Sequence, residues 1–223
     1  MRTTLCAGLR ALCLVIAVLG TMTGIAMSGT NDRALLDAAA RGDAAAVAAL
    51  LSSGADVDAR DGRGRTALLL ATHADHVEAA SLLIEAGADV NAEDDIHDSP
   101  YLYAGARGRL DILRLTLAHG ADLKSTNRFG GTALIPAAER GHVETVRTLI
   151  EAGVDVDHVN NLGWTALLEA IVLSDGGPRH VEIVRLLVDA GADTGIADRD
   201  GVTPLQHARA RGYREIAEIL EGR

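Results

Sequence analysis

The sequence has few aromatic residues and no cysteine after residue 13. Phe, Tyr and Trp make up 2% of the 223 residues, although 48% of them are hydrophobic. A thick core filled by bulky rings is therefore excluded, and burial has to come from Ala, Leu, Val and Ile packed at short range. Both cysteines, Cys6 and Cys13, lie near the N-terminus, so the residues that follow contain no cysteine. A disulfide framework is therefore excluded as well.

The chain also lacks an excess of basic residues and any motif of covalent catalysis. Its formal net charge is −10, and nucleic acid is not expected as a partner because its phosphates are neutralised by Lys and Arg. There is no Gly-x-Ser-x-Gly motif and no Gly-rich loop that opens a helix with Lys. We therefore expect neither enzymatic activity nor a cofactor.

The N-terminal segment resembles an export signal. Two arginines among the first ten residues precede an apolar run at residues 11–19, and the small residues Gly24 and Ala26 resemble a small-x-small cleavage site. We predict that residues 1–28 form a secretory signal peptide and that the chain is periplasmic or otherwise exported. The alternative is an uncleaved anchor in the inner membrane formed by residues 5–27, because about 17–20 apolar residues span a bilayer.

Two motifs recur along the rest of the chain with a period of 33 residues. The first is a Ser or Thr before a short apolar stretch, at Thr66, Ser99, Thr132 and Thr165. The second is Gly-Ala-Asp or Gly-Val-Asp, which begins at Gly54, Gly87, Gly120 and Gly153. Both then shift together by five residues, to Thr203 and Gly191, which places an insertion at residues 174–179. Such regular spacing indicates a repeat architecture.

Each repeat carries the signals of two short helices. The Ser or Thr hydroxyl is expected to accept hydrogen bonds from the free amides of the first helix, and Pro100 and Pro204 suit the first helical position. Pro136 lies further into the first turn, where we expect it to be tolerated. The glycine of the second motif is expected to close the second helix in the left-handed conformation, after which the chain projects a two-stranded finger. Each helix pair leaves one face apolar, so it has to stack on neighbouring pairs to be stable.

These units resemble ankyrin repeats. One unit alone shows the matching residues Asn127, Gly130, Thr132-Ala133-Leu134, Ala137-Ala138, Gly141-His142 and Gly153. The resemblance implies an all-α ankyrin-repeat solenoid of about six helix-turn-helix units with β-hairpin fingers, preceded by an N-terminal signal or anchor helix. We place the repeat domain at residues 31–223 and number its units first to sixth, at 31–60, 61–93, 94–126, 127–159, 160–197 and 198–223.

The histidines and acidic residues follow the repeat rather than clustering. His76, His142 and His180 occupy one repeat position, so they lie in successive layers about 10 Å apart, too far for zinc bonds of about 2 Å. We therefore expect no metal site. The Asp of each Gly-x-Asp motif recurs once per unit and is expected to serve the scaffold.

In ankyrin repeats the finger tips and the exposed side of the first helices commonly bind the partner. The resemblance therefore implies a protein-binding site at Arg63, Arg65, Ile96, Tyr103, Phe129, Leu162 and Trp164. The only Phe and the only Trp lie in adjacent fingers, which suggests an interface hot spot. The alternative is that Trp164 packs on its neighbouring finger and stiffens the array. Tyr101 occupies a leucine position and is expected in the core.

We expect a monomeric, non-catalytic protein-protein interaction scaffold of the cell envelope. Exported ankyrin proteins of some bacteria are associated with protection against peroxide through support of a catalase, so the resemblance implies an envelope or oxidative-stress enzyme as the partner. The alternative is an inhibitor or immunity-type protein that blocks an exported enzyme or toxin, since an acidic surface suits a basic target. Membrane contact is expected only through an uncleaved N-terminal segment.

Overall fold

The computed structural model describes residues 29–222, and the predicted signal or anchor segment lies outside them. Residues 29–41 are helical and lead into α2 (Ala44–Ser52). Five helix pairs follow: α3 (Ala67–Ala74) and α4 (Val77–Glu85), α5 (Pro100–Arg107) and α6 (Leu110–Ala118), α7 (Leu134–Glu139) and α8 (Val143–Glu151), α9 (Ala166–Val172) and α10 (Pro178–Asp189), α11 (Pro204–Arg211) and α12 (Arg214–Glu221). Within these residues, no helix is long and apolar enough to cross a membrane.

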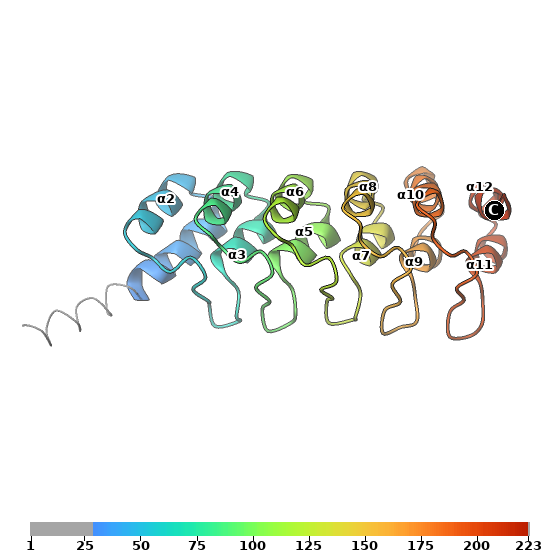
Figure 1. Ribbon diagram of the computed structural model, residues 1–223, viewed down its shortest axis with the longest axis horizontal. Coiled ribbons are helices and arrows are strands. Elements are labelled where there is room, and N and C mark those ends of the chain that lie inside the picture. The colour runs from blue at the N-terminus through green and yellow to red at the C-terminus, as the bar shows by residue number, and fades with distance from the viewer. Residues whose placement is uncertain (1–28, 223) are drawn as a thin grey trace, which may run out of the picture.

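The helices form two layers of an elongated stack (Figure 1). The odd-numbered helices α3 to α11 make an inner layer, the even-numbered helices make an outer layer, and the loops between successive pairs project on the inner side as fingers. This arrangement confirms the all-α repeat stack expected from the 33-residue period. The apolar face of each pair is covered by its neighbours, as expected of a solenoid.

Small side chains allow the inner helices to approach closely. Each inner helix buries a fully enclosed alanine at the same repeat position: Ala71, Ala104, Ala137, Ala170 and Ala208. Gly105 has room for no side chain at all, because a Cβ there would lie 2.7 Å from the Cβ of Ala133. Since carbon atoms pack at about 3.5–4.0 Å, a larger residue would force α5 and α7 apart. The shortage of aromatic residues therefore reflects the spacing between helices.

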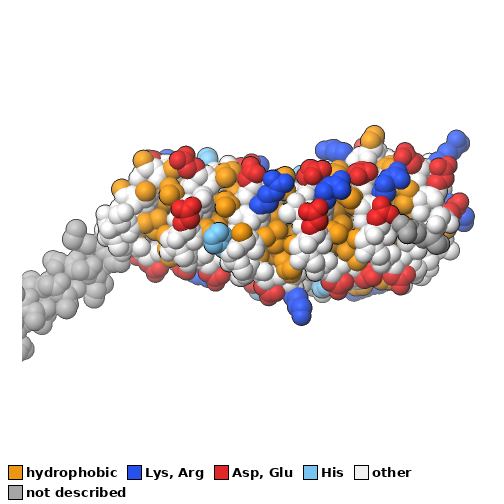
Figure 2. All heavy atoms as spheres, turned by 45° about the horizontal axis from the view of Figure 1, so that its top comes forward, with side chains coloured by type: hydrophobic (Ala, Val, Ile, Leu, Met, Phe, Trp, Pro, Cys, Tyr) orange, Lys and Arg blue, Asp and Glu red, His pale blue; other side chains and the backbone are white. Residues whose placement is uncertain are grey.

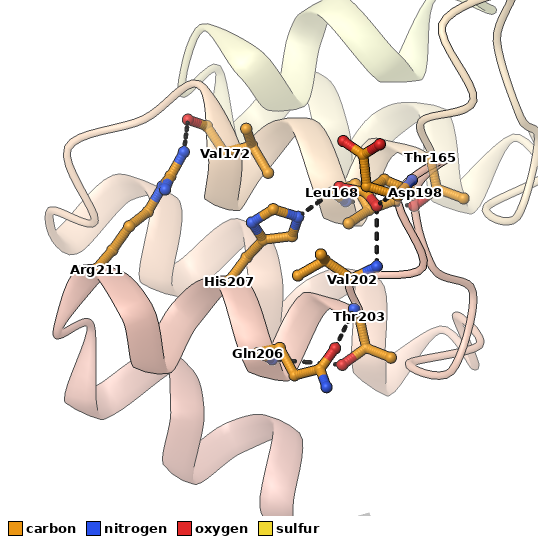
Figure 3. A network of polar contacts seen from close by, with 10 residues as sticks. Thr165, Leu168, Val172, Asp198, Val202, Thr203, Gln206, His207 and Arg211 are labelled. Carbon is orange, nitrogen blue, oxygen red and sulfur yellow. Dashed lines mark hydrogen bonds and ion pairs between the residues drawn. The ribbon is translucent and has the colours of Figure 1, made fainter.

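The predicted caps are present at four of the five inner helices. The hydroxyls of Thr66, Ser99 and Thr165 each accept a hydrogen bond of 3.2 Å from the amide three residues later. At α11 the bond from the Gln206 amide to Thr203 is 3.3 Å, and the Gln206 side chain accepts in return from the Thr203 amide (Figure 3). Such caps are each worth about 1 kcal/mol.

Thr132 is the exception, and Pro136 is the reason. In the other units the amide four residues after the cap donates to the cap carbonyl, as Glu169 does to Thr165 at 3.0 Å. Pro136 has no amide hydrogen, so the Ile135 amide donates to the Thr132 carbonyl instead, at 3.3 Å. The Thr132 hydroxyl is left buried without a partner, and α7 begins only at Leu134. The proline is tolerated, but at the cost of the cap.

The fingers are not β-hairpins, which corrects the prediction of two-stranded fingers. One isolated bridge, between Arg60 and Thr66, is the only β pairing in the described residues. Each finger is instead closed by the side chain of an Asp or Asn at its base: Asp61, Asp94, Asn127, Asn160 and Asp198. Its oxygen accepts from the amides two and four residues later, at 2.8–3.2 Å. A five-residue loop is too short for a ladder, so this Asx turn replaces it.

A second row of side chains links successive units behind the fingers. In three of the Gly-x-Asp motifs the amide of the Asp donates to an Asp or Asn of the preceding unit, for example Asp122 to Asn91 at 2.8 Å. Asp58 and Asp157 accept equivalent bonds from the amides of Asp89 and Asp193, at 3.0 and 2.8 Å. Lys124 stands at the acceptor position of the third unit and has no acceptor atom. Among the described residues, the junction between the third and fourth units therefore lacks this bond.

The repeated histidines pack between layers, as their spacing predicts. A Cβ on Gly108 would lie 2.7 Å from the His142 ring of the next unit, and His76 and His180 face glycines in the same way. Between the second and third units both partners differ: Asp75 replaces the glycine, Arg109 replaces the histidine, and the two side chains pair at 2.9 Å. This repeat position thus makes a contact between layers, either as a histidine against a glycine or as an arginine paired with an aspartate.

The insertion lengthens both the loop and the helix that follow α9. Helix α10 starts at Pro178 and has 12 residues, whereas the other outer helices have 8 or 9. Tyr213 of the sixth unit packs its ring against Gly176 and donates its hydroxyl to the Ser174 carbonyl at 2.7 Å. The insertion is therefore held by the neighbouring unit.

Replacing Lys124 with Asn is expected to stabilise the array. The new amide can accept from Asp155 as Asn91 accepts from Asp122, so the free energy of unfolding should rise by about 0.5–1 kcal/mol. The measurement is a urea denaturation curve of the full chain. Asn91→Ala is the matched opposite change and should lower stability by a similar amount. Equal midpoints for the Lys124→Asn variant and the parent chain would show that this row of bonds does not set the strength of the junction.

Candidate protein-binding groove

A groove of about 240 Å³ lies between the fingers and the inner helices in the middle of the array. Its lining comes from the third, fourth and fifth units. Three of the seven predicted site residues meet there: Tyr103, Phe129 and Leu162. The other four are outside the lining of this groove: Arg63, Arg65, Ile96 and Trp164.

Two apolar finger tips form the lip of the groove. Phe129 and Leu162 occupy the same finger position and are 51% and 50% exposed. The amide of Asn161 donates to the carbonyl of Phe129 at 2.9 Å, which holds the two tips side by side. Ile135 and the half-exposed Leu173 add apolar surface to the lining. Contiguous exposed apolar surface of this kind marks interaction sites more often than isolated residues do.

Arginine side chains support the aromatic rings at the rim. The guanidinium of Arg128 lies 4.8 Å from the ring centre of Phe129, and that of Arg107 lies 5.5 Å from the ring centre of Tyr103. The Tyr103 ring also contacts His73, with ring centres 4.0 Å apart. Tyr101, in contrast, is fully buried, as its leucine position predicts.

The predicted residues outside the groove serve or flank their own fingers. Arg65 pairs with Asp61 at 2.7 Å within one finger. Arg63 and Ile96 are exposed tips of the second and third units. Trp164 is half-buried and closes its finger through a backbone hydrogen bond to Asn160. Of the seven predicted residues, Tyr103, Phe129 and Leu162 are thus the ones that share a groove.

Sequence reasoning missed Glu169, which also lines the groove. Glu169 lies on α9 and is only 6% exposed, and the side-chain Nδ2 of Asn160 donates to its Oε1 at 2.8 Å. Burial, and then the negative charge of Glu139, raise the pKa of Glu169 to about 7. The Asn160 hydrogen bond and the positive charge of Arg140 act in the opposite direction. The groove therefore contains a buried carboxyl group that titrates near neutral pH.

A comparison of one repeat position between units would have found this residue. Glu169 lies at the position of Tyr103, and the row reads Leu70, Tyr103, Pro136, Glu169 and His207. In the sixth unit the equivalent His207 bonds to the finger residue Asp198 at 2.7 Å (Figure 3), as Glu169 bonds to Asn160. The signal in the sequence is therefore an acidic residue at a repeat position whose side chains face the groove.

The outer face of the stack, formed by the even-numbered helices, differs from the groove because its charged side chains form ion pairs with each other. Arg147 on α8 lies 3.3 Å from Glu182 on α10, and Arg185 on α10 lies 3.5 Å from Glu215 on α12. Figure 2 shows acidic and basic side chains interspersed along this face. Exposed pairs of this kind contribute little stability individually, but they leave no large patch of one sign in this region.

The raised pKa of Glu169 predicts a pH-dependent stability. The folded chain holds this proton up to about pH 7, whereas the unfolded chain loses it near 4.5, so stability falls as the pH rises through this window. Glu169→Gln keeps the acceptor for Asn160 and removes the charge. At pH 8 the variant should be more stable than the parent by on the order of 3 kcal/mol, and at pH 4.5 nearly equal to it.

Urea denaturation at pH 4.5, 6 and 8 measures this difference. Glu144→Gln on the outer face is the control, because Glu144 is 62% exposed and its neutralisation should leave the pH profile unchanged. Parallel profiles for the Glu169→Gln variant and the parent chain would mean that Glu169 is ionised without penalty.

Comparison with known proteins agrees with the repeat architecture. A family model described as ankyrin repeats (3 copies) matches residues 12–94, 35–127 and 101–198. The ankyrin repeat protein YahD of Escherichia coli (strain K12) is 42% identical over 53 residues, which are 24% of this chain and 26% of that protein. This chain therefore matches about a quarter of the length of that curated relative.

Two solved structures are similar over nearly their whole length. An ankyrin repeat domain from Acinetobacter baumannii AYE is 66% identical, with a TM-score of 0.83 over 84% of this chain and 96% of that one. The ankyrin repeat protein EF0377 is 46% identical, with a TM-score of 0.82 over 85% of this chain and 97% of that one. With the stacked helix pairs, the 33-residue period and these matches, the chain belongs to the ankyrin repeat family.

Proposed function

We propose that this chain is a non-catalytic scaffold that binds a protein partner through the groove of the third to fifth units. Ankyrin repeats are generally protein-interaction modules. The observation that carries the proposal for this groove is the pair of half-exposed tips, Phe129 and Leu162, held side by side over an apolar wall. Few other described residues expose as much apolar side chain, and most of those that do lie in the same three units: Ile96, Val159 and Leu173.

The size of the apolar contribution suits an interface anchor. Full burial of a Phe or Leu side chain contributes about 1.5–3 kcal/mol, and each of these two is already half-covered. Burying the remainder gives about 1 kcal/mol per tip, before any aromatic contact adds to it. Together the two tips supply a central contact of the size that alanine substitution detects at hot spots, about 2 kcal/mol.

The proposed place of action is the cell envelope. The support is the N-terminal sequence, in which two arginines precede the apolar run of residues 11–19. In this proposal the partner is an envelope or oxidative-stress enzyme, and the scaffold prolongs its lifetime or raises its activity. The chain is anchored to the inner membrane by residues 5–27 if that segment is retained.

An inhibitor or immunity-type protein is the second candidate function. Its support is the net charge of −10, which attracts a basic target and speeds its association. The two candidates differ in what they do to the partner. A supporting scaffold raises the activity or lifetime of the bound enzyme, whereas an inhibitor abolishes activity at a one-to-one ratio.

The first test of the groove is site-specific photo-crosslinking in the native host. A photoreactive phenylalanine at position 129 should crosslink a partner that mass spectrometry identifies, whereas the same residue at position 77 on the outer layer should not. Titration calorimetry with the identified partner then measures Phe129→Ala combined with Leu162→Ala. We expect affinity to fall by at least about tenfold, corresponding to about 1.4 kcal/mol.

Val77→Ala is the matched control for this double variant, because Val77 is an exposed apolar residue of α4, 37% exposed, outside the groove. Both variants should unfold at nearly the urea concentration of the parent chain. Unchanged partner affinity in a folded double variant would remove the groove from the interface.

N-terminal sequencing of the chain isolated from its host tests the proposed location. A mature protein that starts near residue 27 and is released with the periplasmic fraction supports a cleaved signal. An intact N-terminus in the membrane fraction supports the anchor. Recovery of the intact chain in the cytoplasmic fraction would contradict both forms of the export proposal.

A further inference from the structure

Three acidic and three basic side chains line the groove, and its three arginines are engaged by groups other than Glu169. Glu139 and Glu169 both line it, and Arg140 is the cation that acts on Glu169. Arg140 is committed elsewhere: it donates to the Ala106 carbonyl at 2.7 Å and lies 3.9 Å from Glu139. None of the described cationic side chains forms an ion pair with Glu169. The nearby arginines Arg107 and Arg128 lie over the rim rings instead.

One oxygen of Glu169 is available to a ligand. Asn160 donates to Oε1, and no described residue donates a hydrogen bond to Oε2. A carboxylate that is more than nine-tenths buried and has an open acceptor gains most from a ligand that brings a positive charge, because the ion pair compensates its lost hydration. A neutral donor would satisfy the hydrogen-bonding capacity of Oε2 but would leave the negative charge of the carboxylate unpaired.

The dimensions of the groove fit one long side chain. Its volume of about 240 Å³ is below the range of about 300–1,000 Å³ that is usual for small-molecule sites. The lining combines the exposed apolar side chains of Phe129, Leu162 and Leu173 with the buried carboxyl group of Glu169. Lysine and arginine have the matching order of chemistry, with an aliphatic stem and a charged head.

From this complementarity we infer that the groove binds a lysine or arginine side chain of the partner, with its stem between Phe129 and Leu162 and its charged head on Glu169. The inference rests on the proposed function, and it adds the chemistry of the partner segment. It requires that segment to be extended or looped, so that a single basic side chain reaches between two finger tips. The acidic character of the chain as a whole favours such a partner.

The carboxyl group also makes the binding sensitive to pH. A cation that binds the ionised form of Glu169 displaces its proton, so affinity should increase from pH 5 to pH 8. The charged groups around α9 are Glu139 and Arg140 from the α7 side and His207 and Arg211 from α11. His207 pairs with Asp198, Arg211 donates to the Val172 carbonyl, and His180 of α10 lies 3.0 Å from the Glu139 carbonyl. The pH profile of the Glu169→Gln variant is the reference, so that the difference between the two profiles reports this carboxyl group alone.

The test uses the full chain and a set of capped hexapeptides that differ only in one central residue. The probes are Ala-Leu-X-Leu-Ala-Gly with X as lysine, arginine, norleucine or glutamate, titrated by NMR at pH 8. The lysine or arginine peptide should bind at least about tenfold more tightly than the norleucine peptide. Glu169→Gln should abolish this difference, while Glu144→Gln, the same change on the outer face, should preserve it.

The outcomes separate this inference from the proposed function. If lysine, arginine and norleucine peptides bind equally or none binds, and Glu169→Gln leaves the crosslinked partner's affinity unchanged, the basic side chain is excluded. The groove then stays the interface provided that the Phe129→Ala and Leu162→Ala double variant still loses that partner. If both variants bind the partner normally, the interface lies elsewhere and both proposals fail. A preference for the glutamate peptide would also overturn the inference.

Discussion

Close contact between neighbouring helix pairs is the constraint on which the rest of this structure depends. No pair can bury its apolar face alone, so every unit is stable only when its neighbours lie within van der Waals distance. That distance explains the alanine at one position of every inner helix and the glycine at 105, where a methyl group would collide with Ala133. It also explains why a chain with 48% hydrophobic residues contains so few aromatic rings.

Stacking at this distance brings backbone amides of adjacent units together, and short polar side chains satisfy them. Asp58, Asn91 and Asp157 link one unit to the next, and the base residue of each finger closes its own loop. Long side chains would not hold these geometries, since each would lose more rotamer freedom. The recurrent acids are therefore scaffold residues, as their spacing predicts, and much of the negative charge of the chain has a structural origin.

The period, the helix pairs and the left-handed glycines could all be predicted from sequence because each depends on local chemistry. Gly54 and Gly191, for example, close helices with φ of +82° and +92°. The failures arose where one residue acts through another. Pro136 removes a cap by redirecting the amide of Ile135 to the Thr132 carbonyl, and the effect appears only when the hydrogen bonds of the whole turn are considered together.

The candidate site likewise contains residues that the sequence reveals and residues that only the structure reveals. Phe129 and Leu162 could be selected from the sequence because the repeat register places both apolar residues at the same finger position. Glu169 does not, because a glutamate in a short helix usually faces water. Only the positions of Asn160 and Glu139 beside it show that this carboxyl is enclosed. Trp164, the only tryptophan of the sequence, lies outside the lining of the groove.

The missing link at Lys124 has a consequence for the mechanics of the stack. The groove takes its walls from the third, fourth and fifth units, so it lies across the junction that lacks the bond to the Asp155 amide. In a one-dimensional array each unit feels only its nearest neighbours. An occupant that touches Tyr103, Phe129 and Leu162 at once would join the third and fifth units, which are not nearest neighbours, so the three units would open and close more nearly as one cooperative block. The stiffness of the array would then depend in part on whether the groove is occupied.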